Sequence, residues 1–238
     1  MLKNYFKTAW RNLKTNKFYS LINISGLAIG LTTSILLLLW VQHERSFDRF
    51  HKDYENIYQV STHFGNHGGI TIWPSTPAAL ATFAKDIPQI SELVRITDEF
   101  DQVLSNANRS KVMDGHHIAF VDSTFFQMFS FNLLEGSRAK SFPDIYSVMI
   151  TKSLANKLFE KEQALGQILI HRGTPFTVSG ILEDFPDNST IHFDALFPMG
   201  FYGKAFTARG GNGAWKTIDE DLGNYNFQTF IKLNPQTN

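Results

Sequence analysis

The sequence contains no cysteine among its 238 residues. Disulfide bonds, thiolate metal sites and cysteine nucleophiles are therefore excluded. The absence also argues against a small secreted module held together by disulfides. It is equally compatible with a bacterial periplasm and with a cytoplasm.

The familiar catalytic motifs are missing as well. There is no G-x-x-x-x-G-K-[ST] phosphate loop, no G-x-S-x-G nucleophile elbow and no H-E-x-x-H zinc helix. We therefore predict a non-catalytic protein with no cofactor, no metal site and no catalytic residue.

Several polar clusters are better explained as ordinary surface than as sites. Two histidines four residues apart lie at a predicted strand end before a pair of glycines, and not on a helix face that would suit a metal. We expect surface histidines, solvated acids at a strand end and a plain glycine-rich loop. These groups are, respectively, His63, His67, His116 and His117; Asp98, Glu99 and Asp101; and residues 210–213.

Charge is scarce, at 18% of residues, and unevenly distributed. Five basic residues and no acid lie within residues 1–17, although the formal net charge of the whole chain is zero. The rest of the chain therefore holds 17 basic against 22 acidic residues, a net charge of −5. An acidic body argues against nucleic-acid binding, which needs a basic face.

A predominantly apolar stretch without any charged residue runs from Leu21 to Val41. As a helix it would extend roughly 31 Å, the thickness of a bilayer core. A soluble core helix does not need apolar residues on every face. A signal peptide has a shorter apolar segment and a small-residue cleavage site, which "WVQHERSF" does not offer. We therefore predict a retained membrane span over residues 19–45.

The residues flanking this span predict its orientation. Five basic residues precede it, whereas the acids and bases that follow it nearly balance, so the N-terminus is expected in the cytoplasm. Trp40 lies where an interfacial aromatic residue is expected. Gly26 and Gly30 form a G-x-x-x-G pair, which would let another helix pack closely.

Residues 1–18 form a predicted amphipathic helix in the membrane interface. Apolar residues, including Leu2, recur every three or four positions, and basic residues recur similarly on another side of the helix. Residues that served only to set the membrane orientation would need positive charge but no amphipathic arrangement. The residues expected to hold the helix at the membrane are Lys3, Phe6, Lys7, Trp10, Arg11 and Lys14.

The remaining residues, 46–238, alternate short strand-like and helix-like segments, which predicts a mixed α+β domain. Strands are expected over residues 57–64, 91–100, 117–125, 191–199 and 226–234, with a hairpin turning at 172–174. Short helices are expected over 76–88, capped by Thr76, and over 123–129. Residues 146–159 predict a strand followed by a helix, and residues 202–224 a long mobile loop.

Taken in order, several segments resemble MacB/FtsX-like ABC transporter permeases of the Bacteroidetes type. The opening "FKTAWRNLKTNKFYSLINISGLAIGL" is followed by "SFDRFHKDYENIYQV", "VDSTFFQMFSFNLLEG", "MITKSLANKLF" and "FTVSGILEDFPDNSTIHFD". The resemblance covers about residues 3–233. Glu160 stands where the family pattern predicts glycine and Gln59 where it predicts a basic residue, and we interpret both as surface-turn variation.

The resemblance implies a function. Permeases of this family have an interfacial helix, a first span, a large periplasmic domain and three further spans. They dimerise and work with a cytoplasmic ATPase, whose ATP-driven closure moves the periplasmic domains for export or extraction. It implies a homodimer or heterodimer in the bacterial inner membrane, a partner ATPase and a possible periplasmic adaptor. Because no second apolar run follows, we expect an N-terminal fragment or a truncated gene product.

A second class of protein fits the same pattern. A single-span sensor or anchored binding module would also place an α+β domain outside the membrane. Three later apolar runs in the reading frame would favour the permease, and a signalling module would favour the alternative. An anchored enzyme is a weaker third reading, since no nucleophile and base are paired in the sequence.

Overall fold

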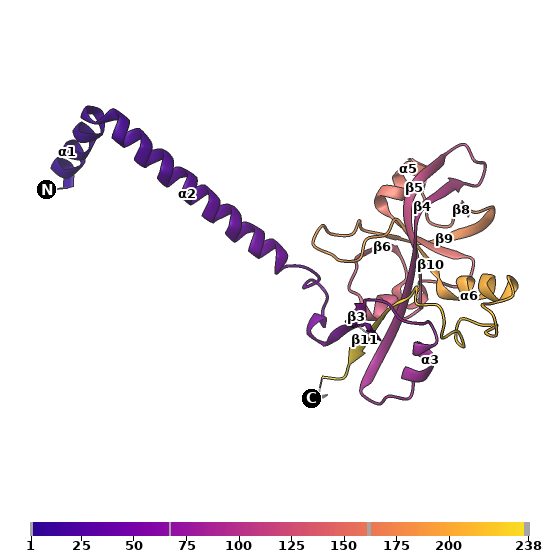
Figure 1. Ribbon diagram of the computed structural model, residues 1–238. Helices are drawn as coiled ribbons and strands as arrows, with labels where there is room; N and C mark the ends of the chain where they lie inside the picture. The colour runs from indigo at the N-terminus through magenta and orange to yellow at the C-terminus, as the bar shows by residue number, and fades with distance from the viewer. Residues whose placement is uncertain (1, 67, 161–162, 236–238) are drawn as a thin grey trace. The chain divides into compact units, whose positions relative to one another are not determined.

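The computed structural model describes residues 2–66, 68–160 and 163–235 (Figure 1). The chain divides into two compact units, Met1–Phe47 and Asp48–Asn238. The first unit contains two helices, α1 (Leu2–Thr15) and α2 (Lys17–Glu44). Along α2, every residue from Leu21 to Glu44 is exposed, as the apolar sequence predicts for a helix that does not belong to a soluble core.

The second unit is a mixed α+β domain built around one large sheet, as the sequence predicts. Two short α-helices, α3 and α4, and two 3₁₀ turns lie before strand β7, and two longer helices follow strands β7 and β10. The strands are β1 (Ile57–Val60), β2 (Thr62–Asn66), β3 (Gly69–Trp73), β4 (Ile90–Asn106), β5 (Val112–Val121), β6 (Leu133–Gly136), β7 (Ser147–Thr151), β8 (Ile168–His171), β9 (Thr174–Leu182), β10 (Ala195–Pro198) and β11 (Gln228–Leu233). The helices are η1 (Tyr54–Asn56), α3 (Leu80–Ala84), α4 (Phe125–Met128), η2 (Arg138–Lys140), α5 (Lys152–Phe159) and α6 (Met199–Ala208).

Six strands of this sheet close into a ring, in the order β4-β5-β10-β7-β9-β8 and back to β4. Strand β4 makes the closure possible because it is 17 residues long. Its first part, from Ile90 to Ile96, pairs with β11, and its last part, from Leu104 to Asn106, pairs with β8. Strand β5 pairs with β4 from Ile96 to Ser105. Register shifts between Glu99 and Leu104 bend β4 between the two parts. A closed ring leaves these six strands with few unpaired edges.

Both faces of the ring are buried, and alternate residues serve different cores. On β5, Ile118 and Phe120 belong to a cluster that fills the ring, whereas Ala119 and Val121 belong to a second cluster on the outer face. Phe197 of β10 is fully buried inside the ring. The inner cluster receives side chains from all six strands and from α5 and α6.

The outer cluster explains why the chain has 22 phenylalanines. It is covered by the segment around α4 and by the loop before β10, both rich in aromatic residues. Stacked and tilted rings of this kind bury large areas with few side-chain torsions to fix. The phenylalanines involved include Phe125, Phe126, Phe129, Phe131, Phe193 and Phe230, with Phe50, Phe142 and Phe185 packed against them.

Four sequence predictions are wrong in detail. Residues 57–64 form two strands, β1 and β2, which belong to different sheets and separate at Ser61. Thr76 does not cap α3, whose N-cap is Ala79, because its hydroxyl shares a hydrogen bond of 2.7 Å with Thr229. Gln59 lies within β1 and not in a turn.

The fourth correction concerns the loop predicted over 202–224, because its first residues belong to helix α6. Gly200 and Gly203 obscured this helix, since glycine disfavours helices. In the fold they allow close packing. A Cβ at Gly200 would lie 3.0 Å from Ile145, and one at Gly203 would lie 3.3 Å from Ile218.

Glu160 ends α5 in a conformation that suits glycine, with φ +55°. The prediction that it lies in an exposed turn is confirmed. Its carboxylate pairs with Lys111, but both side chains are largely exposed, so the pair contributes little. We expect Glu160→Gly to raise the free energy of unfolding by about 1 kcal/mol. Urea denaturation followed by circular dichroism measures the change, and an equal or lower stability would contradict it.

Candidate functional site

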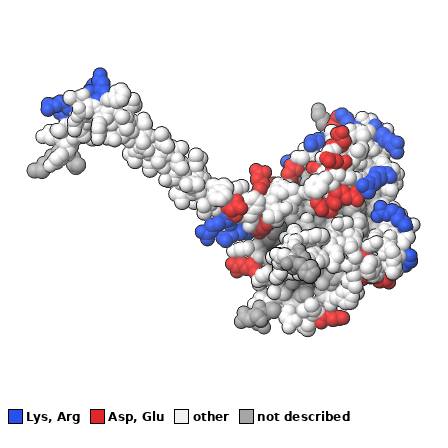
Figure 2. Space-filling model, viewed as in Figure 1, with Lys and Arg blue, Asp and Glu red and all other residues white. Residues whose placement is uncertain are grey.

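The two helices of the first unit carry the predicted membrane contacts. On α1, the side chains of Lys3, Phe6, Lys7 and Trp10 border one shallow depression. Phe6 and Trp10 are 76% and 58% exposed, far more than a soluble protein usually allows for aromatic residues next to one another. Figure 2 shows basic residues gathered over α1, whereas the surface along most of α2 carries no charge.

The basic residues lie beside the apolar stripe and not opposite to it. The Lys14 ammonium lies 5.9 Å from the centre of the Trp10 ring, within range of a cation–π contact. Arg11 lies one turn before Thr15, whose hydroxyl donates to the Arg11 carbonyl. Such a helix can place its rings among acyl chains and its cations among phosphates. The side chain of Leu2, also predicted in this stripe, lies outside the described residues.

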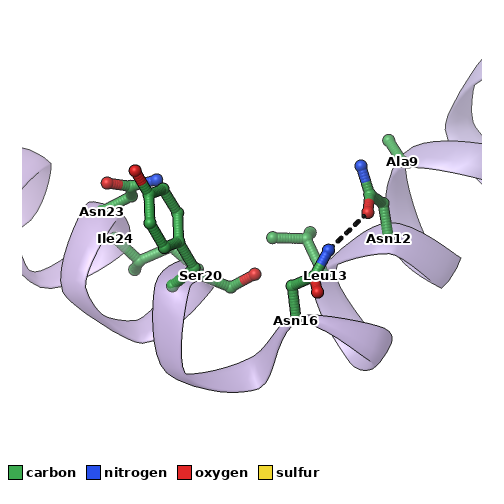
Figure 3. A pocket seen from close by; sticks show the side chains of 8 residues that line it. Ala9, Asn12, Leu13, Asn16, Ser20, Asn23 and Ile24 are labelled. Carbon is green, nitrogen blue, oxygen red and sulfur yellow. Dashed lines mark hydrogen bonds between the residues drawn. The ribbon is translucent and has the colours of Figure 1, made fainter.

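The break between the helices is at Asn16, whose backbone leaves the helical region at φ −107° and ψ +55°. Its side-chain amide donates to Asn12 at 3.0 Å (Figure 3). Around this bond, α1 and α2 form an open polar notch. The notch is lined by Ala9, Asn12, Leu13, Asn16, Tyr19, Ser20, Asn23 and Ile24.

Helix α2 is the one helix in the described part of the chain that is long and apolar enough to cross a membrane. The hydroxyls of Thr33 and Ser34 donate to the carbonyls of Ile29 and Gly30, both at 2.9 Å, which satisfies them without water. Gly26 and Gly30 lie one turn apart, so they share a face of the helix. Among the residues that the structure describes, no atom outside their own helix lies within 4 Å of the positions where their Cβ atoms would be.

The second unit contains two histidine–aspartate pairs that the sequence analysis placed on the surface. His116 is buried, and its Nδ1 lies 2.9 Å from Asp194. His117 Nε2 lies 2.8 Å from Asp98, in the middle of β4, and its ring stacks on Phe100. The predictions of a surface His116 and of a strand-end Asp98 are therefore wrong.

These pairs are structural connections between strands. Burial raises the pKa of Asp194, but hydrogen bonds from the His116 ring and from the His117 backbone N–H outweigh it and leave the pKa below its ordinary value. Asp194 therefore stays ionised and ties β5 to the start of β10. Among the described hydrogen bonds, the His116 and His117 rings bond to these carboxylates, and the nearby Ser153 hydroxyl bonds to Asp184 and not to a histidine.

No group of three or more histidine or acidic side chains is placed to hold a metal within the described ranges. His63 lies in the β2–β3 hairpin and is exposed. His67 lies outside the described residues. Glu99 pairs with Arg172 at 3.1 Å, Asp101 lies in an exposed bend, and residues 210–213 form a loop.

Sequence reasoning missed the residues that hold the start of the second unit. Asp48 and His51, in the segment that follows α2, make contacts with residues more than 70 positions away. Arg95 was likewise given no role, although it forms ion pairs with Asp122 and Asp219. For Arg95 the sequence signal was a charged residue within the alternating strand-like segment 91–100, whereas Asp48 and His51 lie in a mostly polar segment that gave no signal.

Comparison with known proteins identifies the fold of the second unit. A family model described as the MacB-like periplasmic core domain matches residues 20–238. No curated protein matches. Three solved structures resemble the chain at identities that show the fold alone.

The first is described as a permease protein domain from Porphyromonas gingivalis, with 21% identity, a TM-score of 0.65, and coverage of 79% of this chain and 77% of that one. The second is the periplasmic region of MacB from Actinobacillus actinomycetemcomitans, with 15% identity, a TM-score of 0.51 and coverage of 77% of each chain. The third is the extracellular domain of the ABC-type transporter YknZ from Gram-positive bacteria, with 12% identity, a TM-score of 0.52, and coverage of 76% and 85%. The family match spans most of the chain, which therefore belongs to the family of the MacB-like periplasmic core domain found in ABC transporter permeases.

Proposed function

We propose that the chain acts as a permease subunit of a MacB/FtsX-type ABC transporter. In this role a partner ATPase hydrolyses ATP in the cytoplasm, and the span carries the resulting movement to the periplasmic domain for export or extraction of a substrate. The observation that carries the proposal is the order of parts. A basic amphipathic helix and a membrane-length helix lead, through residues 45–47, into a domain of the MacB-like fold.

The charge pattern supports an N-terminus in the cytoplasm. Lys3, Lys7, Arg11, Lys14 and Lys17 precede the apolar stretch, and the acids and bases that follow it nearly balance. The second unit would then lie in the periplasm. In this orientation the cations of α1 would contact the inner-leaflet phosphates, and Phe6 and Trp10 would insert between the lipids.

Gly26 and Gly30 are proposed to form a close packing face for another span, either of the same subunit or of a homodimer or heterodimer partner. We expect the double substitution Gly26→Leu and Gly30→Leu to reduce the assembled complex at least about tenfold, since a side chain at either position would hold the partner helix away. Blue-native electrophoresis of detergent extracts measures the assembled fraction.

Ala28→Leu provides a matched control. Ala28 lies two residues from each glycine and therefore on the opposite side of the helix. The substitution places a leucine side chain of the same size on that side, with a smaller gain in volume than the two glycine substitutions give. Equal assembly of the double glycine variant and the Ala28→Leu variant would remove the packing role.

Co-purification tests the function itself. The protein, expressed with an ABC ATPase from the same genome, should retain that ATPase through affinity purification in mild detergent and raise its ATP hydrolysis. A periplasmic adaptor would be recovered in the same experiment. Recovery of a signalling partner in place of the ATPase would favour the sensor or binding module instead.

A further inference from the structure

Residues 48–53, which follow α2 almost directly, are bound to the domain core at several points. At the start of the segment, the Asp48 carboxylate accepts a hydrogen bond from the Thr190 hydroxyl at 2.6 Å and another from the Thr190 backbone N–H at 2.9 Å. The Asp48 N–H donates to the carbonyl of Asn188 at 2.9 Å. Any displacement of the span would thus reach the domain through a fixed point.

The end of the segment is held as well. The Lys52 N–H donates to the Ser130 hydroxyl at 2.9 Å, and Asp53 pairs with Lys232 of β11 at 2.7 Å. The hydrogen bond from Lys232 holds the pKa of Asp53 below its ordinary value, so this carboxylate remains charged well into the acidic range.

His51 lies between these two anchors and is only 4% exposed. The rings of Phe50, Phe129 and Phe131 surround it at centroid distances of 4.2, 5.2 and 5.0 Å. Its Nδ1 accepts the backbone N–H of Ser130 at 3.1 Å. Because an amide always carries its proton, Nδ1 must be unprotonated and the neutral ring holds its hydrogen on Nε2. Nε2 itself is buried and has no hydrogen-bond partner among the described residues.

We propose that residues 48–53 form an acid-released latch, which neutral His51 holds against the core and which a proton on Nδ1 opens. A proton taken from solvent at Nδ1 would face the Ser130 N–H, so an accepted hydrogen bond becomes a contact between two donors. The imidazolium would also lie among three aromatic rings with one nitrogen unpaired. Burial of such a charge is costly, and withdrawal of the segment into water relieves it.

The charged groups around His51 do not offset the cost of burying the protonated ring. Asp48 is the carboxylate that acts on the ring directly, and it favours the proton. On the same segment, Arg49 lies over Tyr54 and Asp53 is engaged by Lys232. The charged groups on neighbouring elements are Arg138, bound to the carbonyls of Phe126 and Phe131; Glu183, bound to Asn132; and Asp184, bound to Ser153.

The sign of the pH dependence follows from burial, which lowers the pKa of His51 below its ordinary 6.5 more than Asp48 raises it. The closed latch therefore binds a proton more weakly than the open latch does. Closure is fully stable above about pH 6.5 and weakens about tenfold per pH unit as pH falls from there toward the pKa of the closed state.

Hydrogen exchange of the full chain in lipid nanodiscs tests the latch. After correction for the intrinsic pH dependence of exchange, peptides covering 48–53 and 128–132 should exchange faster at pH 5.0 than at pH 7.5. A peptide covering β7 should exchange equally at both. Unchanged protection of residues 48–53 between the two pH values would overturn the proposal.

His51→Asn separates protonation from packing. The asparagine Oδ1 can take the place of Nδ1 as acceptor for Ser130 but does not titrate, so the pH response of residues 48–53 should disappear. His192→Asn, at an exposed position, should keep the response. A His51→Asn protein that responds as the wild type does would refute the latch. If that variant fails to fold, NMR titration of the wild-type imidazole decides, since a His51 pKa at or above 6.5 is equally contradictory.

A consequence for transport, namely that acid would uncouple the span from the domain, rests on the proposed function, whereas the opening itself does not. If exchange of residues 48–53 in the wild-type protein does not change with pH but the protein binds an ATPase, the latch alone is rejected. A pH response without any ATPase partner would reject the transporter role alone.

Discussion

Replacing Arg95 with methionine should lower the free energy of unfolding of the second unit by about 3–5 kcal/mol, because it leaves a partly buried carboxylate without its partner. The Arg95 side chain is 11% exposed, and its guanidinium donates twice to Asp122, at 2.9 and 3.0 Å. Its third nitrogen reaches Asp219 at 2.6 Å. One side chain thus joins β4, the end of β5 and the loop before β11.

Electrostatics favour the charged state of this arginine. Burial lowers the pKa of Arg95, but the bonds to Asp122 and Asp219 raise it further, so the pKa lies above its ordinary value. Lys111→Met is the matched control, because it breaks an ion pair whose side chains are 44% and 63% exposed. Lys111→Met should lower the free energy of unfolding by less than about 1 kcal/mol. Similar urea midpoints for the two variants would contradict the role given to Arg95.

Phe197→Ala should also lower the free energy of unfolding by roughly 3–5 kcal/mol, because it opens a cavity in the middle of the strand ring. The Phe197 ring lies 4.7 Å from Phe176 of β9 and 5.5 Å from Phe120 of β5, between centroids, so it connects opposite parts of the ring. Thermal unfolding followed by circular dichroism measures the loss.

An exposed phenylalanine provides the control for this substitution. Phe83 on α3 is 65% exposed, and Phe83→Ala removes the same atoms without leaving a cavity. We expect its unfolding free energy to stay within about 0.5 kcal/mol of the wild type. An equal loss in both variants would mean that the ring interior is not the main core.

Features set by local sequence could be predicted. The hairpin predicted at 172–174 forms as expected, since Arg172 and Gly173 both adopt positive φ between β8 and β9. The strand-to-helix passage from β7 to α5 is confirmed, with Thr151 accepting the Leu154 N–H as the helix cap. The helical character and length of α2 are also confirmed, because they depend on composition alone.

Features set by distant partners could not be predicted. Closure of the ring depends on which strand pairs with the last residues of β4. The sequence of β4 does not indicate that this strand is β8. His51 meets Ser130 at a separation of 79 residues, and Arg95 meets Asp219 at a separation of 124. Helix α6 was missed because packing against Ile145 and Ile218 outweighs the low helix propensity of its glycines. The membrane and packing roles of α1 and α2 remain predictions, since they depend on lipids and partner chains.

The most direct test of the account is whether the span is retained with the N-terminus inside and the domain outside. The chain has no cysteine, so Thr8→Cys on α1 and Lys152→Cys on α5 each create a single reporter. In intact spheroplasts, a membrane-impermeant maleimide should label the Lys152→Cys protein and reach the Thr8→Cys protein only after lysis. Labelling of Thr8→Cys before lysis, protection of Lys152→Cys, or a mature chain that lacks residues 1–41 would contradict the account.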